Sequence, residues 1–383
     1  MNLLINLLPI KKGGGQQVAF NFVTHLHKFE DINCFFVVTA ETDVHKKLLE
    51  LKVSNILTIK DSLIDRFKFQ SLYLKNYVKE KKIELIYTMF GPGLHCKGIK
   101  SITGCAYSNL FFPEIDFWKG YSFLQKIKLK LIDQYRLSST LKSDAIVFEN
   151  AAMQRRAIER FGYPASQTTL ILPSISEPSM EIQENLDFKQ RIKKLDKNKF
   201  NILMLTGWHK NKNIEQVPFL LAKLKERGVE DVHFVITVSE SHPESIKLKA
   251  LARQLGIENN ITFFAAVKPT EVPRLYEAID AVILLSLLES FSNNIIESWY
   301  FKKPLFISDE EWSRAICQDA AVHVKRDDAI KIANTIINFR ADKELQNNIK
   351  SEARNILQNY PDSKEKVALQ VQFLKRIYDA KSN

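Results

Sequence analysis

Residues 289–297 read Glu-Ser-Phe-Ser-Asn-Asn-Ile-Ile-Glu, and this stretch decides how the rest of the chain is interpreted. An apolar run at residues 281–286 precedes it and predicts a buried strand, and Glu297 lies just inside a predicted helix. Small polar residues of the kind that cap a helix N-terminus lie between the two acids: Ser292, Asn293 and Asn294. A strand, a tight polar loop and a helix start favour anion binding, because free backbone N–H groups and the helix dipole point at the bound group.

The two acids of this stretch suit the hydroxyl groups of a ribose and a sugar. Together with the anion site they predict a pocket for a sugar nucleotide. The alternative is that Glu289 and Glu297 are solvated acids at a helix end.

Length and composition bound the possibilities. A chain of 383 residues favours two domains, and 45% hydrophobic with 26% charged residues is typical of a globular protein. The net charge of +11 predicts an acidic partner, which is a phosphate-bearing substrate, an anionic membrane surface or nucleic acid. No nucleic-acid-binding module is recognisable, so nucleic acid is not expected as a partner. A non-catalytic protein that binds anionic lipid or nucleic acid is the alternative of a different class.

The cysteines and the hydropathy pattern bear on location and cofactors. The four cysteines form no C-x-x-C pair and the chain has no run of 18 apolar residues, which predicts a cytoplasmic protein with free thiols. The apolar start at residues 1–10 lacks the basic region and cleavage site of a signal peptide. No His or Cys cluster has the spacing of metal ligands, so chemistry without a metal or other cofactor is expected.

Two series of alternating strands and helices predict an α/β protein with two Rossmann-like domains. The first series opens with a strand at residues 2–8, a turn at residues 13–15 and a helix from Gln17, and the first domain spans residues 1–173. Residues 174–198 are polar and unpatterned, which predicts the interdomain connection, and the second domain spans residues 199–362. The further strands are predicted at residues 33–39, 56–59, 85–88, 101–106, 145–148, 169–172, 200–205, 232–238, 261–264, 281–286 and 305–308. The clearest helices of the first domain are predicted at residues 62–82 and 123–142.

Five motifs follow one another after residue 199, at residues 206–213, 263–268, 275–276, 289–297 and 313–321. Their order and spacing resemble family 4 of the glycosyltransferases, the "group 1" family of retaining enzymes with the GT-B fold. The resemblance implies a ligand cleft between the two domains and a C-terminal helix, within residues 363–383, that crosses back to the first domain. An ordinary terminal helix of the second domain is the alternative.

The same resemblance implies a function. A hexosyltransferase of this kind moves a sugar from a nucleoside-diphosphate donor to a saccharide or lipid-linked saccharide, with retained anomeric configuration, in the biosynthesis of surface polysaccharides or glycans. A sugar-nucleotide epimerase or a phosphorylase on the same fold is the alternative, since a fold alone does not determine function.

The resemblance implies that the two acids and the loop between them bind different parts of the donor. Glu297 accepts hydrogen bonds from the ribose hydroxyls, as a carboxylate does from a cis-diol, and Glu289 approaches the donor sugar. The backbone amides of Phe291, Ser292 and Asn293 face the sugar and the diphosphate. The family usually has glycines near Ser292 and Asn293, so these residues are departures.

A cation is needed where the leaving diphosphate gains charge. Lys212, followed by Asn213, matches the family's lysine, but the arginine that usually follows the glycine of this loop is missing after Gly207. His209, Lys210 or another cation then replaces the missing arginine. The alternative for Lys210 and Lys212 is that they lie in a solvated loop without a role in binding. The resemblance further implies that the loop around Val267 contributes to the choice of the donor base.

The first domain offers weaker candidates. Glycines at residues 13–15, Gly14 and Gly15 among them, allow the backbone to approach the donor phosphates or the acceptor because glycine has no Cβ; a plain turn is the alternative. The family's histidine in this domain is missing from residues 104–110, so Tyr107, Ser108 and Asn109 are predicted on the acceptor side. His95 is a further candidate, although a lone loop histidine is more often structural or solvated.

Residues 111–142 mix aromatic and basic side chains. Between Lys119 and Lys142 one acid, Asp133, lies among six cations, which favours an anionic membrane surface. The alternative is an amphipathic helix that turns an apolar stripe towards the core. That stripe is Leu124, Ile127, Leu131 and Tyr135.

Overall fold

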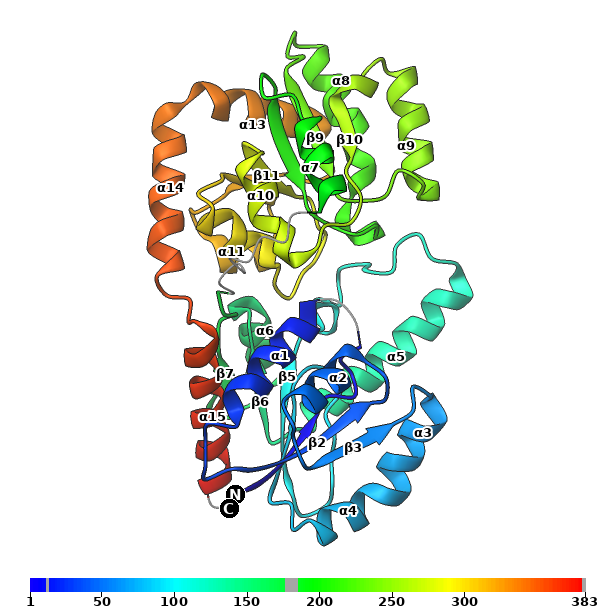
Figure 1. Cartoon of the computed structure of the whole chain (residues 1–383), viewed down its shortest axis with the longest axis vertical. Coiled ribbons are helices and arrows are strands. Elements are labelled where there is room, and N and C mark those ends of the chain that lie inside the picture. Colours follow the sequence, from blue (N-terminus) through cyan, green and yellow to red (C-terminus); the bar gives the residue numbers. More distant parts are fainter. Residues whose placement is uncertain (12–13, 176–184, 381–383) are drawn as a thin grey trace. The chain divides into compact units, whose positions relative to one another are not determined.

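The computed structural model describes residues 1–11, 14–175 and 185–380 (Figure 1). The chain divides into two compact units, of which unit 1 comprises Met1–Ile175 with Tyr360–Asn383, and unit 2 comprises Ser176–Asn359. Gly13, residues 176–184 of the predicted connection and residues 381–383 of the predicted last helix lie outside the described residues.

Unit 1 is built on a parallel sheet of seven strands within the described residues, in the order β3-β2-β1-β4-β5-β6-β7. The order reverses between β1 and β4, which makes this a doubly wound sheet. The strands are β1 (Asn2–Asn6), β2 (Asn33–Thr39), β3 (Ile56–Ile59), β4 (Leu85–Thr88), β5 (Lys100–Cys105), β6 (Ala145–Phe148) and β7 (Thr168–Leu170).

Helices cover both faces of this sheet. The side chains of β1 alternate, so that Leu3 and Ile5 pack in one core with α1 and α15, while Leu4 packs in another with Phe69 and Leu74. The helices are α1 (Gly14–Leu26), α2 (Asp43–Glu50), α3 (Leu63–Lys68), α4 (Leu74–Glu80), α5 (Phe123–Leu141), α6 (Ala151–Phe161) and α15 (Ser363–Asp379), with short turns of helix at η1 (Phe69–Tyr73), η2 (Ser108–Leu110) and η3 (Ala165–Gln167).

Unit 2 repeats the architecture with a parallel sheet of six strands among its described residues, in the order β10-β9-β8-β11-β12-β13. The strands are β8 (Phe200–Met204), β9 (Val232–Ile236), β10 (Ile261–Phe263), β11 (Ala281–Leu284), β12 (Leu305–Ser308) and β13 (Val322–Val324). The helices are α7 (Leu186–Lys193), α8 (Val217–Lys225), α9 (Pro243–Gln254), α10 (Val272–Glu277), α11 (Asn293–Tyr300), α12 (Glu311–Cys317), α13 (Ala329–Ala341) and α14 (Lys343–Leu357), with short turns at η4 (Lys210–Lys212), η5 (Ile214–Gln216), η6 (Glu258–Asn260) and η7 (Pro269–Glu271).

The last helix, α15, belongs to unit 1, as the resemblance implied. Its apolar stripe, which includes Val367, Val371 and Leu374, is buried in the same core as β1 and α1. Lys366 on this helix forms an ion pair of 2.5 Å with Glu149, just after β6, and the two side chains are 4% and 13% exposed. A lysine this deep in the protein is held because its carboxylate partner is buried with it.

The predicted helix at residues 62–82 is interrupted. It consists of α3, a π-helical turn at η1 and α4. Phe69 and Leu74 are both buried, and they are five residues apart, a spacing that an α-helix places on different sides. A π turn, with its i to i+5 hydrogen bonds, brings both side chains to the sheet.

Helix α5 turns its apolar stripe outwards, so the alternative that made this stripe a core contact is wrong. The exposed fractions of Leu124, Ile127, Leu131 and Tyr135 are 77%, 43%, 61% and 55%. The buried residues of α5 are instead Ser139 and Thr140, near its C-terminal end.

Helix α7 lies within the stretch that was predicted to connect the domains. Its Phe188 is buried and packs edge-on against Phe264, with ring centroids 5.7 Å apart. Arg191 lies over the same ring, 4.8 Å from its centroid. Helix α7 therefore packs on unit 2 through Phe188 rather than serving only as a connection.

Candidate functional site

The sheet of unit 2 changes its winding direction between β8 and β11. In doubly wound sheets the ligand binds at such a switch point, outside the carboxyl ends of the two strands. The loop after β8 carries His209, Lys210 and Lys212, and the loop after β11 carries Glu289. The predicted donor residues of the two loops therefore lie at the position where the topology favours a ligand.

Asn211 joins the two loops. It is only 7% exposed, and its amide donates to the carbonyl of Leu288 at 2.8 Å while its side-chain oxygen accepts from the N–H of Leu288 at 3.0 Å. Its backbone carbonyl accepts from the N–H of Leu287 at 2.9 Å. These bonds fix the segment that ends in Glu289, because all the groups involved are paired away from water.

Lys212 and Glu289 form an ion pair through Nζ and Oε1. The side chains are 23% and 15% exposed, so the pair is shielded from bulk water but can be reached by a ligand. Such a pair presents a positive and a negative group side by side, which suits a phosphate and a sugar hydroxyl.

His209 has a local structural task. Its Nδ1 accepts from the N–H of Asn211 at 3.1 Å and caps the turn η4. Burial, together with the charge of Lys212, lowers the pKa of His209 below its ordinary value of 6.5, so the imidazole is neutral at pH 7. It cannot then stand in for the missing arginine as a cation, and Lys210 in the same turn is exposed.

Glu297 lies on α11 beside a tyrosine. The hydroxyl of Tyr276 donates to Oε2 of Glu297 at 3.2 Å. Burial raises the pKa of Glu297 from 4.5 to about 7, although the tyrosine bond opposes this. A carboxylate that is poorly solvated in the free protein has acceptor capacity left for ligand hydroxyls.

The N-terminus of α11 has no side-chain cap. Ser292 occupies the N-cap position with extended backbone, but its side chain accepts no capping hydrogen bond, unlike the caps of many other helices in the chain. Asn294 points elsewhere and donates to the carbonyl of Leu205, after β8, at 2.7 Å. Phe291 and Ser292 are half-buried and Asn293 is exposed, while Val267 is half-buried in the loop after β10.

The candidate residues of unit 1 are mostly engaged in local structure. The ring nitrogens of His95 lie 2.9 Å from Oγ of Ser101 and 2.8 Å from the carbonyl of Ser139. Gly14 and Gly15 form the first turn of α1, which begins before the predicted start at Gln17. A Cβ on Gly15 would meet Ile10 and Phe90 at 3.7 Å, which is ordinary contact, so packing does not require glycine there.

Of the predicted acceptor-side residues, Asn109 contacts Asp133 and Tyr107 contacts Arg136. Arg136 stacks over the ring of Tyr107, with 4.4 Å from its guanidinium carbon to the ring centroid. Asn109 donates to Asp133 at 2.7 Å, and the indole of Trp118 donates to the same oxygen at 2.6 Å. Ser108 is buried. Asp133 is therefore the centre of a polar cluster that fixes this segment against α5.

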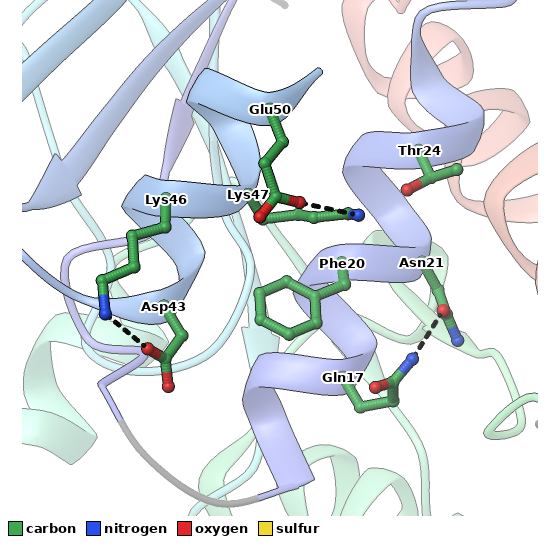
Figure 2. Close-up of a pocket in the computed structure, with 8 residues that line it drawn as sticks. All are labelled: Gln17, Phe20, Asn21, Thr24, Asp43, Lys46, Lys47 and Glu50. Carbon is green, nitrogen blue, oxygen red and sulfur yellow. Dashed lines mark hydrogen bonds and ion pairs between the residues drawn. The ribbon is translucent and has the colours of Figure 1, made fainter. Parts of the chain in front are cut away.

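A groove of about 540 Å³ lies between α1 and α2 (Figure 2). Six of its polar side chains pair with one another, since Lys46 pairs with Asp43, Lys47 with Glu50, and Gln17 with Asn21. None of the predicted site residues lines it, and we place the site at the switch point of unit 2 instead. The lining residues are Gln17, Phe20, Asn21, Thr24, Asp43, Lys46, Lys47 and Glu50.

Neither a metal-ligand cluster nor a membrane-spanning helix is found in the described part of the chain. Among residues 1–11, 14–175 and 185–380, no group of three His, Cys, Asp or Glu side chains is arranged to hold a metal ion. Within those same ranges, every helix is too short or too polar to cross a bilayer.

Comparison with known families identifies the unit that carries the switch-point site. Residues 186–356 match the family model Glycosyl transferases group 1. This part of the chain is a group 1 glycosyltransferase domain. The match begins at α7 and ends within α14, so the glycosyltransferase domain contains both loops of the site and the whole of α11.

Relatives and solved structures extend this comparison. The Uncharacterized glycosyltransferase MJ1607 of Methanocaldococcus jannaschii is 24% identical over 183 residues, which are 47% of this chain and 46% of that relative. The match thus spans about half the length of the relative. A glycosyltransferase from Rickettsia africae superposes with a TM-score of 0.71 at 16% identity, covering 99% of each chain. HepE from Anabaena, in complex with UDP and glucose, gives 0.69 at 15% identity, covering 98% of this chain and 100% of HepE. These structures confirm the GT-B fold.

Three residues that organise the glycosyltransferase domain were not predicted as part of the site. Asn211 and Tyr276 lie within quoted motifs, but their partners are 77 and 21 residues away in the sequence. Arg326, after β13, donates through Nε to the carbonyl of Leu285 at 3.0 Å and is only 11% exposed. No local pattern indicates such partners, because they come together only when the strands align.

Proposed function

We propose that this protein is a retaining glycosyltransferase that moves a sugar from a nucleoside-diphosphate donor to a saccharide or lipid-linked saccharide. The observation that carries the proposal is the Lys212–Glu289 ion pair at the switch point of the glycosyltransferase domain. Asn211 ties together the two loops that carry the pair, which supports a proposal in which Lys212 binds the diphosphate and Glu289 the sugar.

In the proposed mechanism each charged group of the pair exchanges its partner when the donor binds. Lys212 turns to the diphosphate and Glu289 to the sugar hydroxyls, so neither charge is left buried and unpaired. The uncapped amides at the start of α11 face the same phosphates, and Glu297 accepts from the ribose hydroxyls. The diphosphate then leaves with Lys212 offsetting its growing charge.

The acceptor oxygen attacks the anomeric carbon from the face that the diphosphate leaves, which gives retention. The new bond forms between that oxygen and the anomeric carbon, the bond to the diphosphate oxygen breaks, and the acceptor proton passes to the departing phosphate. The protein contributes position and charge rather than a covalent step. Lys212 supplies positive charge that a metal would otherwise bring, so we propose transfer without a cofactor.

The finer assignments belong to the same proposal. The crystal structure of HepE contains UDP, so UDP is the first donor nucleotide to test here. A role in surface polysaccharide biosynthesis, an acceptor site on unit 1 that includes Tyr107 and Asn109, and a cytoplasmic location at the inner face of a membrane follow from the motif resemblance and the basic segment before residue 142.

Nucleotide binding is tested by thermal unfolding with UDP, GDP, ADP, CMP and TDP. A nucleotide at about 100 times its dissociation constant stabilises the protein by roughly 2.7 kcal/mol. We expect one nucleotide to stabilise the wild type and the exposed control Glu258→Gln, but not Glu297→Ala. Equal stabilisation of Glu297→Ala, or no stabilisation by any nucleotide, contradicts the proposed donor site.

Transfer itself is tested with the matching nucleotide sugar and a panel of saccharides. Release of nucleoside diphosphate that depends on an acceptor, with the product's anomeric configuration read by NMR, supports the proposal. Turnover without an acceptor indicates an epimerase, and turnover that needs free phosphate indicates a phosphorylase. Lys212→Ala should lose turnover while Lys210→Ala, in the same turn but exposed, retains it. The reverse result would make Lys210 the diphosphate cation.

A further inference from the structure

The outward face of α5 is apolar over most of its length. Five large side chains of this face are exposed: Phe123, Leu124, Ile127, Leu131 and Tyr135, by 77%, 77%, 43%, 61% and 55%. Helices of globular proteins normally bury such a stripe, and contiguous exposed apolar patches mark interaction sites. We call these five residues the α5 stripe.

Lysines border the α5 stripe on both sides. With about 100° of rotation per residue, the stripe covers an arc of about 120° between Phe123 and Tyr135. Lys130 lies about 20° beyond one edge of this arc and Lys128 about 20° beyond the other. Both lysines are exposed, and neither belongs to an ion pair among those formed by the described residues.

The one acid of this helix is turned inwards. Asp133 is 16% exposed and binds Arg136, Asn109 and Trp118, so its charge is already offset within the protein. The exposed face of α5 therefore combines an apolar centre with positive edges.

Helix α3 has a similar exposed face. Leu63, Ile64 and Phe67 are exposed by 85%, 65% and 71%, with Lys68 beside them. The chain that continues α3 packs on the sheet face formed by Leu4, opposite α1 and α15.

The segment after α5 meets that same sheet face. Ser143 bonds to Thr103 at 2.7 Å, and the neighbouring residue in β5, Ile102, points to the α1 side. Both helices thus cover one face of the sheet, and Figure 1 shows α3, α4 and α5 together at one side of unit 1.

We propose that α5, with α3, docks unit 1 on an anionic lipid bilayer. The apolar stripe enters the interface between headgroups and acyl chains, and the lysines at its edges bind anionic headgroups, as in helices that lie in the membrane plane. Charge selects this occupant over a second copy of the chain, because pairing two α5 stripes would bring like-charged lysines together. The proposal is independent of the transfer reaction, since it requires neither donor nor acceptor.

The test is co-sedimentation of the full chain with vesicles of phosphatidylcholine, alone or mixed in equal parts with phosphatidylglycerol. The wild type should sediment with the anionic vesicles only. Lys128→Gln with Lys130→Gln should weaken this binding about 25-fold, since each lysine near an anionic surface contributes about fivefold. Leu124→Glu with Leu131→Glu should abolish it. Ile246→Glu, at a residue of α9 that is 57% exposed, is the matched control and should bind like the wild type.

Several results would overturn the docking surface. These are absence of wild-type sedimentation, equal loss in Ile246→Glu, or retention of binding by the Leu124→Glu, Leu131→Glu variant. A wild-type dimer in solution that this variant dissociates, without vesicle binding, would assign the stripe to a second copy instead. Unchanged thermal unfolding of each variant establishes that it is folded. Vesicle binding with no sugar transfer would contradict the proposed function and leave the docking surface standing.

Discussion

Replacing Glu297 with glutamine should stabilise the free protein at pH 8, although it removes a residue of the proposed donor site. Burial raises the pKa of this carboxyl from 4.5 to about 7. Each pKa unit corresponds to about 1.36 kcal/mol, so ionising Glu297 costs up to about 3 kcal/mol more in the folded than in the unfolded chain. Glutamine has nearly the same shape and can still accept the Tyr276 hydrogen bond. Since the side chain is half-buried rather than sealed, we expect Glu297→Gln to gain about 1 to 3 kcal/mol.

The sign of the pH dependence follows from the direction of this pKa. A folded-state pKa above the unfolded value means that the folded protein holds its proton more tightly between pH 4.5 and about 7. The contribution of Glu297 to stability is therefore complete below pH 4.5 and is lost as the pH rises to about 7. Titration of all other groups is shared by both variants, so the difference between Glu297→Gln and wild type should be small at pH 5 and reach its maximum above pH 7.

The assay is urea unfolding at pH 5, 6, 7 and 8, followed by tryptophan fluorescence. Three of the four tryptophans, Trp208, Trp299 and Trp312, lie in unit 2 and report on the region around Glu297. Glu258→Gln, at an exposed acid of the same unit, should change stability little at any pH. A Glu297→Gln variant that is less stable than wild type at pH 8, or a difference that does not vary with pH, would refute the reasoning.

Three further predictions concern the site and the core of unit 1. Because Glu297 must be ionised to accept two ribose hydroxyls, the affinity for the donor nucleotide, measured by calorimetry, should fall up to about tenfold for each pH unit below 7. An affinity that does not change between pH 5.5 and 8 would contradict this role. Asn211→Ala should lower the stability of unit 2 by about 1 to 3 kcal/mol, because it leaves buried backbone groups unpaired, and it should also lower turnover in the transfer assay. Unchanged turnover would show that the loop keeps Glu289 in place without the Asn211 side chain. Lys366→Ala should destabilise unit 1 by about 3 to 5 kcal/mol in urea unfolding, because it leaves the charge of Glu149 buried and unpaired. A double variant, Lys366→Met with Glu149→Leu, should lose less, and an equal or greater loss would indicate that the packing of the lysine stem matters more than its charge.

The sequence predicts the strands of this fold well, because the parallel strands are short apolar runs with polar ends. The limits of β2, β3 and β12 agree with the predicted ones. β2 and β12 are buried along most of their length, whereas β3, at the edge of its sheet, is only half-buried. Shorter elements were missed. The strand β13 has only three residues, Val-His-Val. The helix α7 lies in a polar part of the sequence, and Phe188 is its one buried residue.

Helix α5 illustrates a different limit. Hydrophobic periodicity predicted the helix to within one residue, at residues 123–142 against Phe123–Leu141. The same periodicity cannot tell which way the apolar face points, because a face for a membrane and a face for a core have the same spacing.

In the candidate site, too, one part could be predicted from the sequence and another could not. The spacing of Glu289 and Glu297 is local and visible in the sequence, whereas the bonds of Asn211 to residues 287–288 depend on two strands that meet in the sheet.

The return of α15 to unit 1 has a consequence for synthesis on the ribosome. Residues 1–175 emerge first, but their core is open until Val367, Val371 and Leu374 arrive from the last part of the chain. Unit 2 is continuous in sequence and can complete its core earlier, although it is encoded later. The nascent first unit must therefore wait with apolar surface uncovered while the second one folds, which makes it the part most exposed to aggregation or to capture by chaperones. A stop codon that removes only α15 would leave the proposed donor residues intact and still leave the core of unit 1 incomplete.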